Sequence, residues 1–454
     1  MAASWQERAF APFRRRDLLL ALLPPAALAL LVAIFGVDLP YYDQWELAPR
    51  FFAWSEGHFP WQAIWERHNE HRLIVPQMIM LGLGRLTGWN ILFELALNLL
   101  LAAATFAVLA LQLGRGLEGD RCFSALLPLL SLMVFSPSQW GNWSWGWQIQ
   151  IFLAMLLVAA GILLLDTRPR TPLVFLGATL CAAVAPFSFA NGLLLFPLGL
   201  PLVLREKSRR GLWTGLWLAA GALVYWLYGA AGVGRRAIPG ENALERLETQ
   251  VNYLLHYLAG PILNWPGVVT GVAHVLVPLS FVLLGWLMLH HRRQWEAMLP
   301  WLTLAGFGLA SAAMTAYGRY TFGIGQALST RYFTIANFYW IGLAGVVVVA
   351  LRAAPRRKAA TAAFLGLALC LLAGAAIGTR DFAADSRGKQ ELRALLRGQE
   401  ATTPEAAAQV PFPDAETVRQ RIETLRDLRL SLFRPSEDLS PLPPSPRTER
   451  GVTP

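Results

Sequence analysis

Residues 331–351, RYFTIANFYWIGLAGVVVVAL, carry a single charge, at Arg331. A helix of this length spans a bilayer, whose hydrocarbon core requires about 20 apolar residues. The rest of the chain repeats the pattern, since 55% of the 454 residues are hydrophobic and 15% are charged, where a soluble domain has about 25% charged residues. This composition excludes a disordered chain, a coiled coil and an ordinary soluble enzyme, and it predicts an all-α polytopic membrane protein.

Eleven stretches are apolar enough to be candidate spans: 18–37, 90–113, 122–137, 148–165, 171–187, 190–204, 211–230, 268–289, 298–317, 331–351 and 359–378. The first lacks a small-x-small cleavage pattern and is interpreted as a retained anchor. The apolar stretch 73–87 is short and contains Pro76 and Arg85. We interpret it as a half-helix or an interfacial helix, with an extension of the next span as the alternative. The sequence thus predicts about eleven crossings within residues 18–378.

The net charge of +10 is concentrated in short clusters between apolar runs. With the N-terminus (1–17) in the cytoplasm, alternating crossings place every short basic cluster on the cytoplasmic side, as the positive-inside rule requires. These clusters are at 14–16, 115–121, 168–170, 205–210, 292–293 and 352–358. We therefore expect membrane lipids, and not nucleic acid, as partners. Three cysteines, at 122, 181 and 370, have no paired spacing and predict neither a disulfide framework nor a CxxC metal site.

The same alternation places the loops 37–72 and 231–267 and the tail 379–454 on the outer side. Aromatic residues interleave with charges in the first loop, which predicts interfacial helices. The second loop has a helical pattern from Glu241 to Tyr257. In the tail, an amphipathic helix is expected at about 414–433, capped by Asp414 and packed on the outer face of the membrane domain. The last 15 or so residues are expected to be disordered from their composition.

Candidate chemistry concentrates in the first outer loop. Asp43 directly follows the first span and is a candidate general base, although a helix cap or an ion-pair partner is an equal alternative. Glu46 shares a face with Asp43 if the segment is helical. The run 68–72 abuts an apolar stretch and supplies five candidate substrate contacts: His68, Asn69, Glu70, His71 and Arg72. The spacing of the two histidines also permits metal ligation, but a third ligand is not evident.

Three further outward segments carry candidates. Asn191, in the segment 188–192, is either part of a hairpin turn or a substrate contact. The segment 317–333 breaks the positive-inside pattern with Arg319 and Arg331, which together with Gln326 make a plausible anion clamp. Four tryptophans crowd the loop 138–147, either as part of an interfacial belt or as the wall of a sugar site.

The chain has no Walker loop, GxSxG, HExxH or CxxC motif, so the usual signals of ATPases, serine hydrolases and zincins are absent. Its topology and first loop resemble the GT-C glycosyltransferases, multi-span enzymes that use polyprenyl-phosphate sugars at the outer leaflet. YYDQWE (41–46), HNEHR (68–72), SFANGLLLFP (188–197) and GRYTFGIGQALSTRY (318–332) also resemble a group of bacterial multi-pass membrane proteins.

The resemblance implies a bacterial inner-membrane glycosyltransferase that transfers a sugar from a lipid-linked donor to a cell-envelope acceptor on the periplasmic face, with inversion. It implies Asp43 as the base and Arg319 or Arg331 as phosphate ligands. The family often has two adjacent acids, whereas Gln44 follows Asp43 here, so Glu46 or Glu70 would supply the second acid. Use of a divalent cation stays open, as do two other functions: a flippase of lipid-linked oligosaccharide and a non-catalytic envelope assembly factor. If the chain is an assembly factor, deleting residues 400–454 should abolish its function, whereas a transferase should keep its activity without them.

Overall fold

The computed structural model describes residues 13–117, 124–229, 240–351, 357–398 and 403–435. Within these ranges the regular elements are helices, apart from one backbone bridge between His68 and His71. Each predicted span overlaps a helix: α2 (Arg15–Phe35), α6 (Ile91–Leu117), α7 (Leu126–Val134), α9 (Ile149–Asp166), α10 (Pro172–Val184), α11 (Leu195–Leu204), α12 (Arg210–Tyr228), α15 (Val277–His290), α16 (Trp295–Arg319), α18 (Phe333–Leu351) and α19 (Arg357–Arg397). The span predicted at 122–137 corresponds to only nine helical residues in α7, and the span 268–289 begins with α14 (Val268–Gly271) and a π-helix, η7 (Val272–Leu276). The all-α fold class is therefore confirmed for the described part of the chain.

Seven helical segments in the described ranges are long and apolar enough to cross a membrane. They are Arg15–Phe35, Ile91–Gly116, Gly146–Asp166, Val268–His290, Arg292–Phe322, Thr330–Leu351 and Ala362–Arg397. The helices α7, α10, α11 and α12 are not among them. The chain is thus a multi-pass membrane protein by its helices, and the number of eleven crossings stays a prediction.

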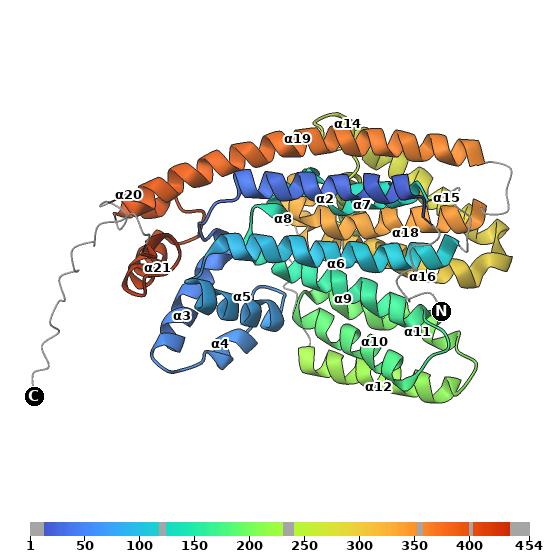
Figure 1. Ribbon diagram of the computed structural model, residues 1–454, viewed down its shortest axis with the longest axis horizontal. Coiled ribbons are helices and arrows are strands. Elements are labelled where there is room, and N and C mark those ends of the chain that lie inside the picture. The colour runs from blue at the N-terminus through green and yellow to red at the C-terminus, as the bar shows by residue number, and fades with distance from the viewer. Residues whose placement is uncertain (1–12, 118–123, 230–239, 352–356, 399–402, 436–454) are drawn as a thin grey trace, which may run out of the picture.

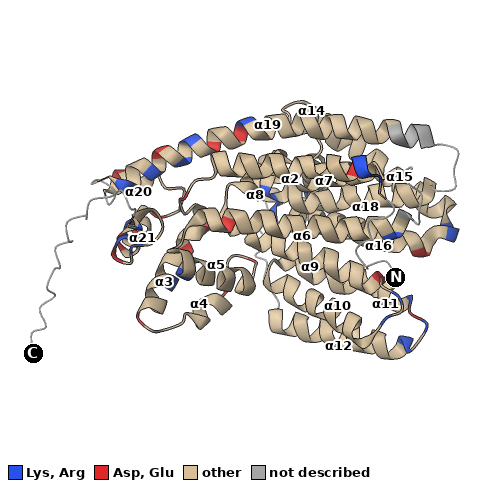
Figure 2. Cartoon of the chain, in the orientation of Figure 1, with Lys and Arg blue, Asp and Glu red and all other residues tan. Residues whose placement is uncertain are grey.

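The helices run roughly along one axis, so the bundle has two ends (Figure 1). The short helices α3 (Ala48–Ser55), α4 (Trp61–Trp65), α5 (Ile74–Thr87), α20 (Pro404–Ala408) and α21 (Ala415–Asp427) gather at the left end. Lys and Arg occur at the left end along α19 and on α21, and a second group lies at the right end, around the ends of α11, α12 and α16 (Figure 2). The elements predicted outside thus lie opposite this second group, as alternating crossings require. Which end faces the cytoplasm stays a prediction.

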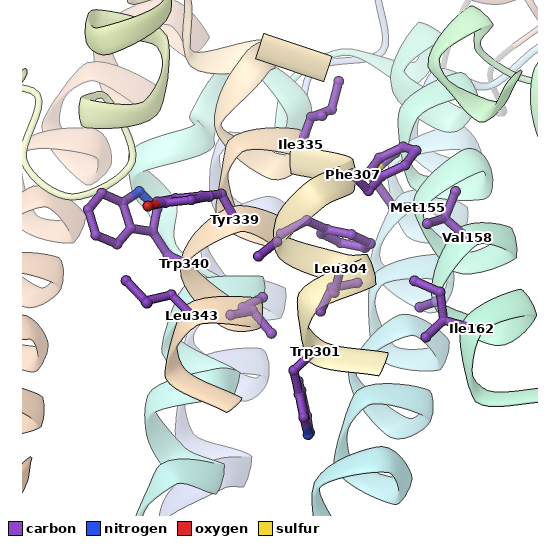
Figure 3. Close-up of a cluster of buried hydrophobic side chains, with 14 of the residues drawn as sticks. Met155, Val158, Ile162, Trp301, Leu304, Phe307, Ile335, Tyr339, Trp340 and Leu343 are labelled. Carbon is purple, nitrogen blue, oxygen red and sulfur yellow. The ribbon is translucent and has the colours of Figure 1, made fainter. Parts of the chain in front are cut away.

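The core of the bundle contains α9, α16 and α18. Met155 and Val158 of α9 face Phe307 of α16, and all three are buried (Figure 3). A Cβ at Gly342 would collide with the backbone nitrogen of Ala305, so α16 and α18 cross in close contact. Small residues at a crossing allow this approach of two backbones. The crossing fixes the end of α16 and the adjoining start of α18, and side chains from the end of α16 and from residues 331–332 line the cavity described below.

α19 corrects one predicted boundary. The last span was expected to end at residue 378, but the helix continues without interruption to Arg397. The sequence becomes polar after 378 yet contains no proline before Arg397, so helix formation does not stop where apolarity stops. The polar half is fixed by Lys389, which lies 2.8 Å from Asp385 and donates to the Ser144 carbonyl at 2.7 Å. The tail therefore begins as an extension of the last span.

The stretch 73–87 forms a separate helix, α5, that ends at Gly88. Gly88 has φ of +64° and Trp89 has φ of +55°, so the chain turns sharply before α6 begins. The alternative of a continuous extension of α6 is therefore wrong. The half-helix or interfacial helix remains as the interpretation of this segment.

The two outer loops contain the expected helices. In the first loop, α3 and α4 expose Phe52, Trp61 and Trp65, as helices in a membrane interface do. In the second loop, α13 (Ala243–Ala259) exposes Leu244 and Leu247. An amphipathic face that is exposed outside the core is typical of contact with lipid.

The tail helix α21 covers the first outer loop. The Asp414 side chain accepts from the Thr417 amide at 2.9 Å, which confirms the predicted cap. Val418, Ile422 and Leu425 are fully buried, as the amphipathic pattern predicts, and they belong to the same apolar cluster as Leu47 of the first loop. The helix ends at Asp427, earlier than the predicted residue 433. The end predicted to be disordered, the last 15 or so residues, lies outside the described residues.

Candidate functional site

A cavity of about 780 Å³ lies where distant parts of the chain meet. Its walls are formed by distant segments of the chain: the first outer loop, the start of α9, residues 189–193, the end of α12, the end of α16 and the 317–333 segment. Eight of the candidate residues line it: Asp43, His68, Asn69, Glu70, His71, Asn191, Arg319 and Arg331. The structure thus brings together three stretches that the sequence places as many as about 290 residues apart, a proximity that follows from the helix packing. What these residues do stays a prediction.

Asp43 lies in a short helix, η1 (Tyr42–Leu47), between the first span and α3. Its carboxylate is 3.3 Å from Nε2 of His68, and the Asp43 side chain is 36% exposed. The His68 ring in turn contacts the edge of Trp147, with centroids 5.3 Å apart. A carboxylate that is partly open to a cavity and paired with an imidazole is able to accept a proton from a bound hydroxyl.

The 68–71 segment is a tight turn. The backbone amides and carbonyls of His68 and His71 exchange two hydrogen bonds, of 2.9 and 3.0 Å, and Asn69 adopts φ of +53°. Asn tolerates this left-handed conformation better than most residues. The turn therefore presents His68, Glu70 and His71 to the cavity together, which a continuous helix with the same spacing would not do.

His71 is held as a neutral imidazole. Its Nδ1 accepts the Ala190 amide at 3.3 Å, so the proton is on Nε2, which lies 3.5 Å from the Glu70 carboxylate. The ring stacks on Phe189 with centroids 4.2 Å apart. Burial is the main cause that lowers the pKa of His71 from 6.5 to about 4, against the opposing charge of Glu70.

This pKa makes stability depend on pH. Because the unfolded chain protonates His71 near pH 6.5 and the folded chain only near pH 4, the unfolded state binds more protons between these values, and stability falls as the pH is lowered through this window. We expect a loss of about 2 kcal/mol between pH 7 and pH 5, at about 1.4 kcal/mol for each unit of pKa shift. Thermal unfolding of the purified protein at several pH values measures it.

The control for this prediction is the exposed His58 of the same loop. His71→Gln removes the titrating group, so its stability should change less between pH 7 and pH 5 than that of the natural chain. His58→Gln should keep the natural pH dependence. Equal slopes for His71→Gln and the natural chain would contradict the neutral, buried state of His71.

Glu70 pairs with Arg319 across the cavity. Nε of Arg319 donates to the Glu70 carboxylate at 2.8 Å, and a second nitrogen of the guanidinium also contacts it. Burial raises the pKa of Glu70, but His71 and Arg319 outweigh burial, so the pKa lies below its ordinary value. Glu70 is therefore a carboxylate near neutral pH, and it already neutralises one of the two predicted anion-binding arginines.

Arg331 is the other arginine. Its guanidinium lies over the Tyr332 ring, 5.3 Å from the centroid, and its Nε is buried without a hydrogen-bond partner in the described part of the protein. No Asp or Glu of the described ranges lies within 4.0 Å of it. A positive charge that lines a cavity without an acidic partner favours an anionic ligand.

Three candidate residues do not line the cavity. Glu46 lies 3.5 Å from Arg421 of the tail helix, which corrects its predicted place beside Asp43 in a catalytic pair. Arg72 donates to the carbonyls of Tyr228 and Trp65, because a guanidinium is well suited to joining two backbone segments. Gln326 reaches the cavity indirectly, since it donates to the Tyr332 hydroxyl at 3.2 Å.

Other lining residues were absent from the predicted set. Gln148 is fully buried, and its amide nitrogen, like that of the predicted Asn191, finds no partner within the described residues. Arg67 also lines the cavity and donates to the Tyr228 and Gly229 carbonyls. The position of Gln148 at the start of an apolar run is the sequence signal from which its place in the cavity was predictable, because polar groups there are costly unless they have a function.

The tryptophans of the loop 138–147 are mostly buried. Trp143 and Trp147 are at most 1% exposed and Trp145 is 7% exposed, so the interfacial belt is the wrong interpretation for these three. Trp145 and Trp147 instead form one wall of the cavity. In the turn at 188–192, Gly192 packs directly against the backbone of Ala185, where a Cβ would collide.

Metal ligands do not cluster in the described ranges. No three His, Cys, Asp or Glu side chains there are close enough to hold a metal ion together. Asp43 and His68 offer two ligands to the cavity, and their separation of 3.3 Å suits a direct contact between them.

The chain was also compared with known proteins. No protein-family model matches it, and neither does any curated protein sequence or any solved structure.

Proposed function

We propose that the chain is a glycosyltransferase of the bacterial inner membrane, which transfers a sugar from a polyprenyl-phosphate-linked donor to a cell-envelope acceptor at the periplasmic face. One observation carries the proposal: the same cavity is lined by a partly exposed carboxylate, Asp43, and by Arg331, which has no acidic partner among the described residues. Transfer from an anionic leaving group requires both, a base for the acceptor and a cation for the departing phosphate.

The cavity suits a sugar phosphate. Its volume of about 780 Å³ lies within the usual range of about 300–1,000 Å³ for small-molecule sites. The amide nitrogens of Gln148 and Asn191, which have no partner in the described part of the chain, match ligand hydroxyls, because buried polar groups require a hydrogen-bond partner. Trp147 and Phe189 add aromatic surface, on which the apolar face of a sugar ring packs.

The proposed step is a single inverting displacement. The acceptor hydroxyl transfers its proton to the Asp43 carboxylate as its oxygen forms a bond to the anomeric carbon. The bond between that carbon and the phosphate oxygen breaks, and its electron pair remains on polyprenyl phosphate. Arg331 stabilises the additional negative charge of the leaving group. His68 contacts Asp43 and orients it, while the Glu70–Arg319 pair forms the facing wall.

The experiment uses the full-length protein in lipid nanodiscs. It is incubated with a panel of short-chain polyprenyl-phosphate hexoses and pentoses and with envelope extract as acceptor, and release of free polyprenyl phosphate is followed by mass spectrometry. We expect release from at least one donor. Absence of both release and transfer across the panel, together with no binding of farnesyl phosphate, would refute the proposal.

The anion site is tested by binding farnesyl phosphate. Arg331→Ala should weaken binding by about 10- to 100-fold, because a hydrogen bond to a charged group contributes about 1.5–3 kcal/mol. Arg331→Lys should keep part of the affinity, since it keeps the charge but loses the planar fork. The control is Arg380→Ala, which removes an exposed arginine of α19 that pairs with Asp381. Equal affinity for Arg331→Ala and the natural chain would remove Arg331 from the site.

A further inference from the structure

The neighbour of Asp43 in the chain, Gln44, is fully buried and held at both ends of its amide. Its Nε2 donates to a carboxylate oxygen of Glu94 at 2.7 Å, and its Oε1 accepts the Tyr41 amide at 3.2 Å. The amide therefore bridges the start of η1 to the start of α6. A short helix of this kind has little stability of its own, so such contacts decide where its side chains lie.

Glu94 is 1% exposed and lies near the start of α6. Its second oxygen accepts the indole N–H of Trp89 at 2.9 Å. In the described ranges no Lys, Arg or His lies within 4.0 Å of it, so neutral donors alone satisfy this carboxyl group. A buried carboxyl without a cation is costly near the membrane, and a hydrophobic residue would fill the space more stably. The directed contact to Gln44 is what a hydrophobic residue does not supply.

The same group of residues also holds the tryptophan wall of the cavity. A Cβ at Gly146 would collide with the Glu94 carboxylate and lie 2.8 Å from Nε2 of Gln44, so the loop backbone passes directly against this pair. The indole N–H of Trp145 donates to the Tyr41 carbonyl at 2.8 Å. The Gln44–Glu94 pair therefore connects two walls of the cavity, the one that carries Asp43 and the one that carries Trp145.

We propose that Gln44 and Glu94 are positioning residues that fix the Asp43 carboxylate relative to the tryptophan wall. Neither lines the cavity, so they act through η1 and not on the substrate. The catalytic part of this inference rests on the proposed function. The anchoring of residues 42–47 does not, and it is measured separately.

A swap of the two side chains tests the pair. In Glu94→Gln, the new amide NH₂ faces a group that is itself a donor, either Gln44 Nε2 or Trp89 Nε1, so one of the two hydrogen bonds at position 94 is lost. Gln44→Glu alone places two carboxyl groups against each other. In the double variant Gln44→Glu/Glu94→Gln the amide and the carboxyl change places, so each group again has a partner, and the carboxyl at position 44 still accepts the Tyr41 amide. Both single variants should therefore be impaired and the double variant restored.

The first readout is hydrogen exchange of the backbone amides of 42–47 in the purified full-length protein. Exchange should rise at least about tenfold in both single variants and return to within about threefold of the natural chain in the double variant. Gly146→Ala disturbs the same pair from the other side and should also raise exchange. Unchanged exchange in the single variants, or no restoration in the double variant, would overturn the inference.

The matched control is at the opposite end of α6. Gln112 Nε2 donates to the Asp166 carboxylate at 2.8 Å, an amide–carboxylate contact in which the acid is partly buried and also pairs with Arg205. Gln112→Glu also brings two carboxyl groups together, beside Arg205, and should leave exchange at 42–47 unchanged. A rise there equal to that in Gln44→Glu would mean that general destabilisation, and not local anchoring, is measured.

The second readout is transfer. Glu94→Gln should lower kcat by at least about tenfold and change KM for the donor by less than about threefold, because misplacing a base by about 1 Å has large effects on the reaction and small effects on binding. An unchanged kcat in Glu94→Gln, with Asp43→Asn inactive, would overturn the positioning role. Full activity of Asp43→Asn would instead refute the proposed function, and the exchange measurements would still decide whether the pair anchors 42–47.

Discussion

Asp43→Asn is expected to lower the rate of sugar transfer by a factor of about 10²–10⁴, the usual contribution of a positioned general base. The amide has nearly the same shape as the carboxylate but cannot accept the acceptor's proton. The His68 contact at 3.3 Å and the packing of η1 remain possible for the amide, so folding should be preserved. The rate of polyprenyl phosphate release, measured with saturating donor, checks the effect on kcat.

Two variants control for loss of charge alone. Glu56→Gln neutralises an exposed carboxylate of the same outer loop and should keep the natural rate. Glu46→Gln weakens the contact with Arg421 but leaves the cavity intact, so its effect on kcat should be small beside that of Asp43→Asn. A variant Asp43→Asn that retains the natural rate would exclude this residue as the base and with it the proposed mechanism.

Loss of the packing between the tail helix and the first outer loop is expected to have the largest effect on stability. Ile422 is fully buried in the cluster that also contains Leu47 and Ala48. Ile422→Ala should lower the free energy of unfolding by about 2–5 kcal/mol, as large-to-small substitutions in cores do. Denaturant unfolding of the purified protein, followed by tryptophan fluorescence, measures this change.

The control is Arg419→Ala on the solvent side of the same helix. Arg419 pairs with Glu416 at 2.6 Å and with Glu423 at 3.5 Å, but exposed pairs of this kind contribute little to stability. If Arg419→Ala and Ile422→Ala were equally destabilising, helix formation and not burial against the loop would be the source of the stability of the tail.

The packing of the tail also changes the expectation for deletion of residues 400–454. From the sequence alone, a transferase was expected to retain activity without them. The structure shows that Arg434 contacts Asp38 and donates to the Thr87 carbonyl at 3.1 Å, and that Ser431 donates to the Gly88 carbonyl at 2.8 Å. Deletion would remove these contacts and expose the cluster under η1, so it should lower stability and transfer together.

Much of the fold was predictable because a membrane imposes strong local rules. Long apolar runs must form helices in lipid, where each backbone polar group requires an internal partner, so the positions of the spans followed from composition and length. The cap at Asp414 and the buried face of Val418 and Ile422 followed from the helical repeat. The end of α19 did not follow, because apolarity marks where a helix leaves lipid and not where it stops.

The sequence by itself determined the all-α class, the apolar segments that form helices, and the set of residue types available for chemistry. Only the tertiary structure decided which of those residues meet. Asp43, His68 and Arg331 line one cavity, whereas Glu46 faces the tail and Arg72 holds backbone carbonyls. The physical reason is that hydrophobic periodicity is a local property of the chain, while a cavity is made by contacts between helices far apart in sequence.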